Sequence, residues 1–283
     1  MSYWHIDYHS KYQALTFEVT EVLKSIQSPY QKIEVVETPA YGKVLLLDDD
    51  LMLTEKDEFA YHEMLVHPTM FTHSYPQKIL IIGGGDCGTL TRVLQHKTVE
   101  KVVIVELDEM VTQVSQEYFP QLVSSTQDPR VELIFTDGIK YVHNCTDKFD
   151  VILVDSTDPI GPAEGLFRLS FFQDCHKILE EDGILCLQSE SPWIPELAEL
   201  ISYVNQDLKS LFPVVKAYGA AIQTYQAGFW IFQLASKKYN PLSKEIENKI
   251  KEADLKTKYY NPNIHYGAFK LPTFVNELLH EPS

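Results

Sequence analysis

The chain has little of what secreted, membrane-spanning or nucleic-acid-binding proteins need. Its four cysteines show neither paired nor metal-ligand spacing, which argues against a disulfide framework and favours a reduced, cytoplasmic protein. No apolar run approaches the roughly 20 residues of a membrane span, and no apolar stretch follows a basic start, so we expect neither a membrane anchor nor a signal peptide. Basic residues are also scarce: the net charge of −16 argues against a nucleic-acid partner. It weakly favours a cationic substrate, although an acidic surface serves solubility as often.

Metal-binding patterns are missing too. The ten histidines are scattered, and His62 and His67 have no matching carboxylate or cysteine spacing, so the sequence predicts no zinc site. The consecutive acids Asp48, Asp49 and Asp50 lack the spacing of an EF-hand loop, which favours a charged hairpin turn. We therefore expect no bound metal.

What the chain does contain is two successive patterns of secondary structure. Short β-rich segments broken by turn residues predict a small antiparallel domain over residues 1–56. From Lys78 onward apolar strands alternate with helices, which is typical of a doubly wound parallel sheet, so residues 57–283 are predicted to form an α/β domain. The first domain should have strands at Ile33–Glu37, Lys43–Leu47 and Leu51–Thr54, and helices are expected over Glu58–Thr72 and Lys244–Leu255.

The segment from Asp150 to Phe167 is the most informative in the chain. It passes directly from an apolar strand into a loop that holds two carboxylates, Asp155 and Asp158. Two prolines and a glycine in this loop stop both strand and helix, so the two acids are predicted at the carboxyl end of a buried strand. That is where α/β enzymes bind their ligands. The alternative is an Asx-turn that only closes the strand.

A second apolar strand, Lys78–Ile82, breaks into three glycines, Gly83 to Gly85, with a helix expected up to about His96. Glycines let a nucleotide-type ligand approach the backbone closely, but a packing turn at a helix start explains them about as often.

Two later features favour a nucleotide-type ligand over a packing turn. Glu106 ends the next strand roughly 20 residues beyond the glycines, where an acid suits a grip on two ribose hydroxyls. Asp137 and Gly138 follow a third strand, Val131–Phe135. Together they make a nucleoside site the better interpretation.

These motifs, in this order and spacing, resemble the spermidine synthase family, the aminopropyltransferase branch of the methyltransferase-like Rossmann folds. The matching segments are Gly83–Asp86, Val105–Asp108, Asp137-Gly138 and Asp155–Pro162, and outside them Tyr41-Gly42, Leu47-Asp48, Thr54–Met64, Thr224-Tyr225 and Tyr259–Pro262 with His265. The resemblance covers nearly the whole chain, from about Trp4 to Leu279.

The resemblance implies transfer of an aminopropyl group from decarboxylated S-adenosylmethionine to putrescine, which gives spermidine and methylthioadenosine. The nucleoside is then a co-substrate, and no resident cofactor is expected. The family also implies a homodimer or homotetramer, through the β-rich amino-terminal unit.

The family's functional residues carry over onto matching positions. By resemblance Asp155 is the proton acceptor and Asp158 holds the charge of the substrate. The amine site would comprise Tyr61, His62, Asp86, Asp155, Ser156, Thr157, Asp158 and Tyr225. The donor site would comprise Gln31, Gly83, Gly85, Glu106, Asp137, Gly138 and Pro162. In this setting His62 is interpreted as a hydrogen-bonding wall residue rather than a base.

Asp86 is predicted to share one crevice with Asp155 and Asp158, because all three follow strand ends. If it points into the crevice, it would repel the carboxylate of ordinary S-adenosylmethionine and bind the ammonium of the decarboxylated donor. Without the family, a cap on the helix that begins near Gly88 is equally good.

The chain departs from the family pattern at three places. Cys87 stands where a glycine or another small residue is usual, Thr91-Arg92 replaces an Arg-Glu pair, and Gln223 replaces a proline. The missing acid at position 92 puts a structural ion pair there in doubt, and Gln223 predicts a looser amine-site wall. A putrescine methyltransferase and a non-catalytic polyamine-binding protein are the rivals, and the intact acids argue against both.

Overall fold

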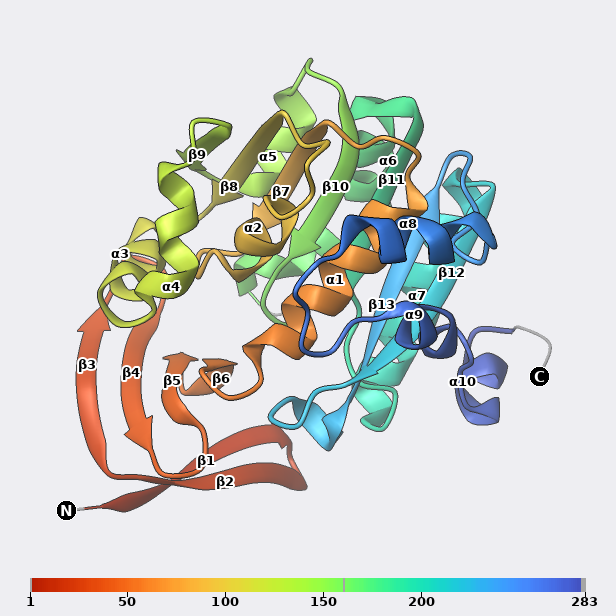
Figure 1. The fold of residues 1–283 in the computed structure, drawn as a ribbon. Coiled ribbons are helices and arrows are strands. Elements are labelled where there is room, and N and C mark those ends of the chain that lie inside the picture. The colour runs from red at the N-terminus through yellow and green to blue at the C-terminus, as the bar shows by residue number, and fades with distance from the viewer. Residues whose placement is uncertain (1, 160, 281–283) are drawn as a thin grey trace.

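The computed structural model describes residues 2–159 and 161–280, beginning with β-structure (Figure 1). The hairpin of β1 (Tyr3–Ser10) and β2 (Gln13–Val19) precedes a four-stranded antiparallel sheet of β3 (Glu21–Gln27), β4 (Lys32–Thr38), β5 (Gly42–Leu47) and β6 (Asp50–Thr54). The predicted strands at Ile33–Glu37, Lys43–Leu47 and Leu51–Thr54 are confirmed as β4, β5 and β6. The first three strands were not predicted, because half-exposed strands such as β3 lack a clean apolar alternation.

The consecutive acids between β5 and β6 form a hairpin turn, as predicted. Asp48 and Asp49 both have positive φ, 50° and 72°, which is the pattern of a type I′ turn. The backbone N–H of Lys32 donates to Asp48 Oδ1 at 2.8 Å, and Lys32 Nζ pairs with Asp49 Oδ1 at 3.0 Å. These contacts tie the turn to β4.

The second sheet has the strand order β12-β13-β11-β10-β7-β8-β9. Its strands are β7 (Lys78–Gly83), β8 (Lys101–Glu106), β9 (Val131–Phe135), β10 (Phe149–Asp155), β11 (Leu179–Gln188), β12 (Val214–Ala221) and β13 (Phe229–Ser236). The strands from β7 to β11 are parallel, whereas β13 is antiparallel to both β11 and β12. The predicted α/β sheet with a small antiparallel amino-terminal unit is confirmed. The antiparallel β13 differs from the expected parallel pattern, because a short loop joins it to β12.

Helices cover both faces of this sheet (Figure 1). They are α1 (Glu58–Thr72), α2 (Gly88–Val93), α3 (Glu109–Tyr118), α4 (Pro120–Val123), α5 (Gly138–Asn144), α6 (Leu169–Ile178), α7 (Pro195–Leu211), α8 (Glu245–Ala253), α9 (Pro262–Ala268) and α10 (Thr273–Leu278). Successive side chains of β7 point to opposite faces. Ile79 and Ile81 join the core beneath α1 and α2, and Leu80 and Ile82 join the core beneath α5 and α6.

Two helices match their predicted ranges and one is shorter. The helix α1 occupies the predicted Glu58–Thr72, and α8 lies within the predicted Lys244–Leu255. The helix α2 ends at Val93 rather than near His96, because the chain tightens there into turns with i to i−3 hydrogen bonds. None of the helices in the described ranges is both long and apolar enough to cross a membrane.

The topology places the site. The strands β7 and β10 are neighbours. The chain continues from β7 to β8 toward one edge of the sheet, and from β10 to β11 toward the other edge. Such a switch point is where open α/β sheets bind ligands. The amino-terminal sheet lies beside it, because Ile33, Val35 and Leu45 pack against Val111 and Val114 of α3. We call the loops 83–86 and 155–158 with the facing side chains of α1 the switch-point site.

Candidate active site

Glycines bring the two loops of the switch-point site into contact. The N–H of Gly84 donates to the backbone oxygen of Asp155 at 2.8 Å. A Cβ at Gly83, whose φ is +81°, would lie 2.1 Å from that same oxygen, and one at Gly84 would lie 2.8 Å from Asp155 Oδ2. The glycines are therefore needed for packing within the chain, whatever else approaches them.

The two carboxylate oxygens of Asp155 have different surroundings. The hydroxyl of Tyr61 on α1 donates to Oδ1 at 2.8 Å. The second oxygen, Oδ2, is buried and has no hydrogen-bond partner in the described part of the chain. Burial and the nearby charge of Asp86 raise the pKa of Asp155, against the opposing effect of His62 and Tyr61. The arrangement provides a fixed carboxylate with one oxygen available and a basicity above the ordinary value.

Aromatic rings form the wall beside this carboxylate. The ring of Tyr225 lies 5.3 Å from that of Tyr61, centroid to centroid, and its hydroxyl donates to the backbone oxygen of Met52 at 2.7 Å. The neighbouring Thr224 donates twice to the buried carboxylate of Asp57, from its N–H at 3.1 Å and its hydroxyl at 2.8 Å. These bonds tie the wall to α1 and β6, so the looser wall that Gln223 predicted is not evident in its contacts.

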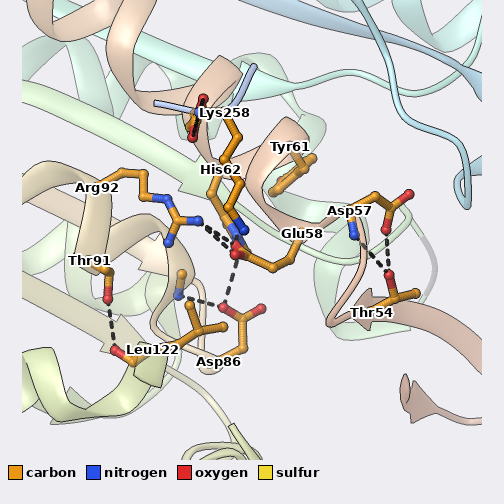
Figure 2. Close-up of polar contacts among 12 residues, drawn as sticks. Thr54, Asp57, Glu58, Tyr61, His62, Asp86, Thr91, Arg92, Leu122 and Lys258 are labelled. Atoms are coloured by element: carbon orange, nitrogen blue, oxygen red, sulfur yellow. Dashed lines mark hydrogen bonds and ion pairs between the residues drawn. The ribbon is translucent and has the colours of Figure 1, made fainter. Parts of the chain in front are cut away.

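His62 lies between two carboxylates (Figure 2). Its Nδ1 contacts Glu58 Oε2 at 2.7 Å, and its Nε2 contacts Asp86 Oδ1 at 3.4 Å. Burial lowers the pKa of His62, but the charges and hydrogen bonds of Asp86 and Glu58 outweigh burial and raise it to about 10. A ring with this pKa is charged near neutral pH, and both its nitrogens are engaged. His62 is therefore unsuited to act as a base.

Asp86 takes the capping role, one of the two that the sequence left open. Its Oδ1 accepts from the N–H of Gly88 at 2.6 Å, at the start of α2, and the same oxygen faces His62. The adjacent Cys87 has a φ of 66°, in the left-handed region, which explains why a glycine suits this position. Burial, together with the charges around it, raises the pKa of the Cys87 thiol, so we expect it to be unreactive.

Arg92 corrects an expectation from the sequence. The absence of an acid at position 92 put a structural ion pair there in doubt, and that doubt was wrong. Arg92 donates to both oxygens of Glu58, at 2.7 and 2.9 Å. The acid comes from the first turn of α1, so the spacing along α2 could not reveal it. The contacts with His62 and Arg92 outweigh burial and lower the pKa of Glu58 to about 2.

The predicted donor residues gather beside β8. Glu106 is buried, and its Oε1 accepts from the N–H of Asp108 at 2.8 Å. Burial raises the pKa of Glu106 to about 7. A Cβ at Gly85 would lie 3.0 Å from the Glu106 carboxyl carbon, so the glycine loop and this acid are in contact. Gln31 reaches the same place from the loop between β3 and β4, since its Nε2 donates to Asp108 Oδ2 at 3.1 Å. Asp108, which the sequence analysis did not single out, joins the two units.

The remaining donor residues lie after β9 and β10. Asp137 caps α5, because its Oδ1 accepts from the N–H groups of Ile139 and Lys140. A Cβ at Gly138 would lie 2.7 Å from Ile82, which accounts for that glycine by packing. The side chain of Pro162 lies outside the part of the chain that the structure describes.

The loop after Asp155 is supported from β11. Gln188 donates to the backbone oxygens of Ser156 and Thr157 at 3.3 and 3.4 Å. Thr157 is exposed, Asp158 is half-buried, and Ser156 Oγ is buried without a hydrogen-bond partner among the described residues.

Glu190 is a candidate that the sequence analysis missed. It is fully buried, with a φ of 68°. Its Oε1 accepts from Gln188 at 3.1 Å, and its Oε2 has no hydrogen-bond partner within the described residues. Burial and the charge of Asp158 raise its pKa well above the ordinary value. A strained, buried acid at a strand end is typical of functional sites, and the strand-end rule that found Asp155 would have found it.

Among the described residues, no group of three or more histidine, cysteine or acidic side chains could hold a metal ion. Fold and site together define an α/β enzyme with a glycine loop, a strand-end acid and carboxylates gathered at the switch point of its sheet.

Comparisons with known proteins identify the family. A model described as the spermine/spermidine synthase domain matches residues 58–248, and one described as the spermidine synthase tetramerisation domain matches residues 3–55. A polyamine aminopropyltransferase of Clostridium perfringens (strain 13 / Type A) is 44% identical over 279 residues, which cover 99% of this chain and 98% of the relative. One from Thermoanaerobacter sp. (strain X514) is 45% identical over 281 residues, with 99% and 100% covered.

Solved structures agree. The crystal structure of spermidine synthase from Thermotoga maritima matches with a TM-score of 0.92 and 36% identity, covering 99% of this chain and 95% of that one. A spermidine synthase in complex with the transition state analogue AdoDATO matches with a TM-score of 0.94 and 37% identity, covering 98% and 95%. The chain belongs to the spermine/spermidine synthase family and is a polyamine aminopropyltransferase.

Proposed function

We propose that this enzyme transfers the aminopropyl group of decarboxylated S-adenosylmethionine to putrescine, with Asp155 as the proton acceptor. The observation that carries the proposal is the Asp155 carboxylate, whose Oδ1 is fixed by Tyr61 and whose buried Oδ2 has no hydrogen-bond partner in the described ranges. A related spermidine synthase has been crystallised with the transition state analogue AdoDATO, which supports a nucleoside-containing donor.

The reaction needs a neutral amine, because a protonated one has no lone pair. Amines of this kind have pKa values near the lysine value of about 10, so a group in the site must take a proton. The amine nitrogen attacks the methylene carbon bound to the sulfonium, the new C–N bond forms, and the C–S bond breaks. Methylthioadenosine leaves as a neutral thioether. Asp155 takes one proton from the bound ammonium, which frees the lone pair that attacks, and the new secondary amine keeps the positive charge. The raised pKa of Asp155 makes it a better acceptor than an exposed aspartate.

The sulfonium is already an activated leaving group, so this reaction requires no cofactor or metal beyond its two substrates. Positioning then supplies most of the catalysis. We assign donor binding to Glu106, whose carboxylate faces the glycine loop, with Gln31 beside it on the shared partner Asp108. The roles of Asp137, Gly138 and Pro162 in holding adenine remain part of this proposal.

Asp86 is proposed to select the donor. A carboxylate beside the glycine loop repels the carboxylate of ordinary S-adenosylmethionine and attracts the ammonium of the decarboxylated form. Its fixed place, on Gly88 and His62, keeps that charge at the site.

The substrates are tested by product analysis. The purified enzyme is incubated with putrescine and, separately, with decarboxylated or ordinary S-adenosylmethionine, and products are identified by mass spectrometry. We expect spermidine and methylthioadenosine from the decarboxylated donor alone. N-methylputrescine from the ordinary donor would show a methyltransferase instead.

We also propose a homodimer or homotetramer assembled through the amino-terminal unit. The support is an exposed face on β1, where Trp4, Ile6 and Tyr8 are 66%, 43% and 68% exposed, within the segment that matches the tetramerisation domain. Light scattering that shows a monomer at working concentration would contradict it.

A cytoplasmic location is proposed too, supported by four cysteines that are all free.

A further inference from the structure

Four charged side chains form a continuous chain from α2 to the switch-point site (Figure 2). Arg92 Nη2 donates to Glu58 at 2.7 Å, Glu58 contacts His62 at 2.7 Å, and His62 faces Asp86 at 3.4 Å. Their side chains are 9%, 12%, 3% and 16% exposed, in that order along the chain. The charges alternate in sign, so each group stabilises its neighbours in a site that little solvent screens.

The geometry leaves each link little freedom. Glu58 and His62 are four residues apart on α1, so they share one face of that helix. The His62 ring packs against the first residue of α2, since a Cβ at Gly88 would lie 2.1 Å from its Cε1. Arg92 reaches both oxygens of Glu58 with a single nitrogen, which holds the end of that side chain in place.

We propose that Arg92 is a positioning residue for aminopropyl transfer: by holding Glu58 it fixes the His62 ring against Asp86, and so sets the place of the Asp86 carboxylate beside Asp155. Arg92 touches no substrate in this role. Its effect reaches the reaction through three contacts, and the inference rests on the proposed function of Asp155 as proton acceptor.

The link from Asp86 to Asp155 is electrostatic. The Asp86 carboxylate is among the charges that raise the pKa of Asp155, after burial, while His62, Thr89 and Tyr61 oppose it. An Asp86 that is displaced would therefore leave Asp155 a weaker base.

The groups that face this chain of four charged side chains come from several elements. His62 meets Glu58 from its own helix and Asp86 from the loop after β7, with the Tyr61 ring 5.3 Å away. Arg92 also lies near His67. Burial is the main cause that lowers the pKa of His67, and the charge of Arg92 lowers it further. Of these groups, Tyr61 reaches Asp155 through its own hydroxyl, and Asp86 reaches it through its charge.

Arg92→Met tests the proposal. It keeps an unbranched apolar stem but removes the guanidinium cation and its two hydrogen bonds to Glu58. We expect kcat/KM for putrescine to fall by about tenfold to a hundredfold, the range that small displacements at an active site produce. We also expect the acid limb of its pH profile to move to lower pH, because Asp155 becomes less basic. Arg92→Lys, which keeps the charge, should recover part of the loss.

Arg130→Met is the matched control. Arg130 is also a partly buried arginine that pairs with an acid, Asp128 at 2.8 Å, and donates to the backbone oxygens of Val99 and Leu94. It has no contact with the switch-point site, so we expect its removal to lower stability without changing kcat/KM or the pH profile. Equal losses in the two methionine variants, or full activity in Arg92→Met, would overturn the proposal.

A measurement on the wild-type enzyme guards against a variant that fails to fold. Nitrogen-15 NMR of labelled histidines, with His62 assigned through His62→Gln, should show protons on both ring nitrogens at pH 8. A His62 ring with only one protonated nitrogen at that pH would overturn the proposal. This readout does not depend on activity, so absence of spermidine from the wild-type enzyme would count against the proposed function alone.

Discussion

The hydroxyl of Tyr61 donates a hydrogen bond to Asp155 Oδ1 at 2.8 Å. In Tyr61→Phe the carboxylate loses its fixed orientation. A hydrogen bond to the charged form lowers a pKa, so its removal raises the pKa of Asp155 further. We expect turnover to fall by about tenfold to a hundredfold and the acid limb of kcat/KM to move to higher pH, measured as a pH–rate profile.

Tyr118→Phe provides the comparison for that profile. The Tyr118 hydroxyl donates to the backbone oxygen of Leu23 at 3.1 Å, far from the switch-point site along the fold. Its removal should leave the profile unchanged. An acid limb that stays in place in Tyr61→Phe would show that this hydroxyl does not act on Asp155.

Residues at strand ends could be predicted from the sequence, whereas their partners could not. Asp155 follows an apolar strand and precedes residues that stop it, a local signal. Arg92 and Glu58 are 34 residues apart in sequence. Their pairing depends on how α1 lies against α2, and no local pattern carries that information. For the same reason the doubt about an ion pair at position 92 was wrong.

At the scale of elements, one buried carboxylate of α1 binds three successive backbone N–H groups of the C-terminal segment. Glu63 is 3% exposed and accepts from the backbone N–H groups of Lys258, Tyr259 and Tyr260. In Glu63→Gln one acceptor oxygen becomes an amide group that faces donors. We expect the free energy of unfolding to fall by about 1 to 3 kcal/mol, measured by urea denaturation.

Glu247→Gln is the matched control for this anchor, because Glu247 is exposed and its partner is the exposed Lys251. Its effect should be within about 0.5 kcal/mol of zero. Equal destabilisation by the two substitutions would refute a special role for Glu63.

Elements with a strong period or an apolar run could be predicted, and half-exposed ones could not. The strands β7 and β10 are continuous apolar runs, and β4 to β6 are bounded by turn residues. The hairpin β1–β2 carries exposed aromatic side chains, so its pattern does not distinguish a sheet from a loop. Its position becomes clear only when its partner strand is known.

At the scale of the whole molecule, a buried histidine pair predicts acid sensitivity. His67 Nδ1 and His96 Nε2 are 3.0 Å apart, both rings are buried, and burial lowers the pKa of His96 to about 3. A depressed pKa means that the unfolded state binds the proton more tightly. The contribution is therefore fully present above the unfolded value of about 6.5 and is lost as the pH falls toward 3.

The expected size of this effect follows from linkage. Between pH 7 and pH 5 the free energy of unfolding falls by about 2 kcal/mol, because His96 is protonated in the unfolded chain but stays neutral in the folded state. In His96→Gln this term is absent, so the stability difference between wild type and variant should shrink by that amount between pH 7 and pH 5. Urea unfolding at both pH values measures it, and parallel pH dependences would contradict the assignment.

The architecture of the molecule follows from its sequence better than its internal contacts do. Alternation of strands and helices after Lys78 indicates a doubly wound sheet, and short β-rich segments broken by turn residues indicate the amino-terminal unit. The Asp57 contacts with Thr224 and the Asp108 contacts with Gln31 both join segments that are distant in sequence. Those contacts depend on three-dimensional packing.

The central claim is that Asp155 accepts the proton during aminopropyl transfer. The most direct test compares wild type with Asp155→Asn, following methylthioadenosine release with saturating putrescine and decarboxylated S-adenosylmethionine, and donor affinity by calorimetry. An amide of the same shape cannot take the proton, so the account predicts turnover lower by about a hundredfold to ten-thousandfold with donor affinity largely kept. An unchanged rate of release in Asp155→Asn would contradict the account.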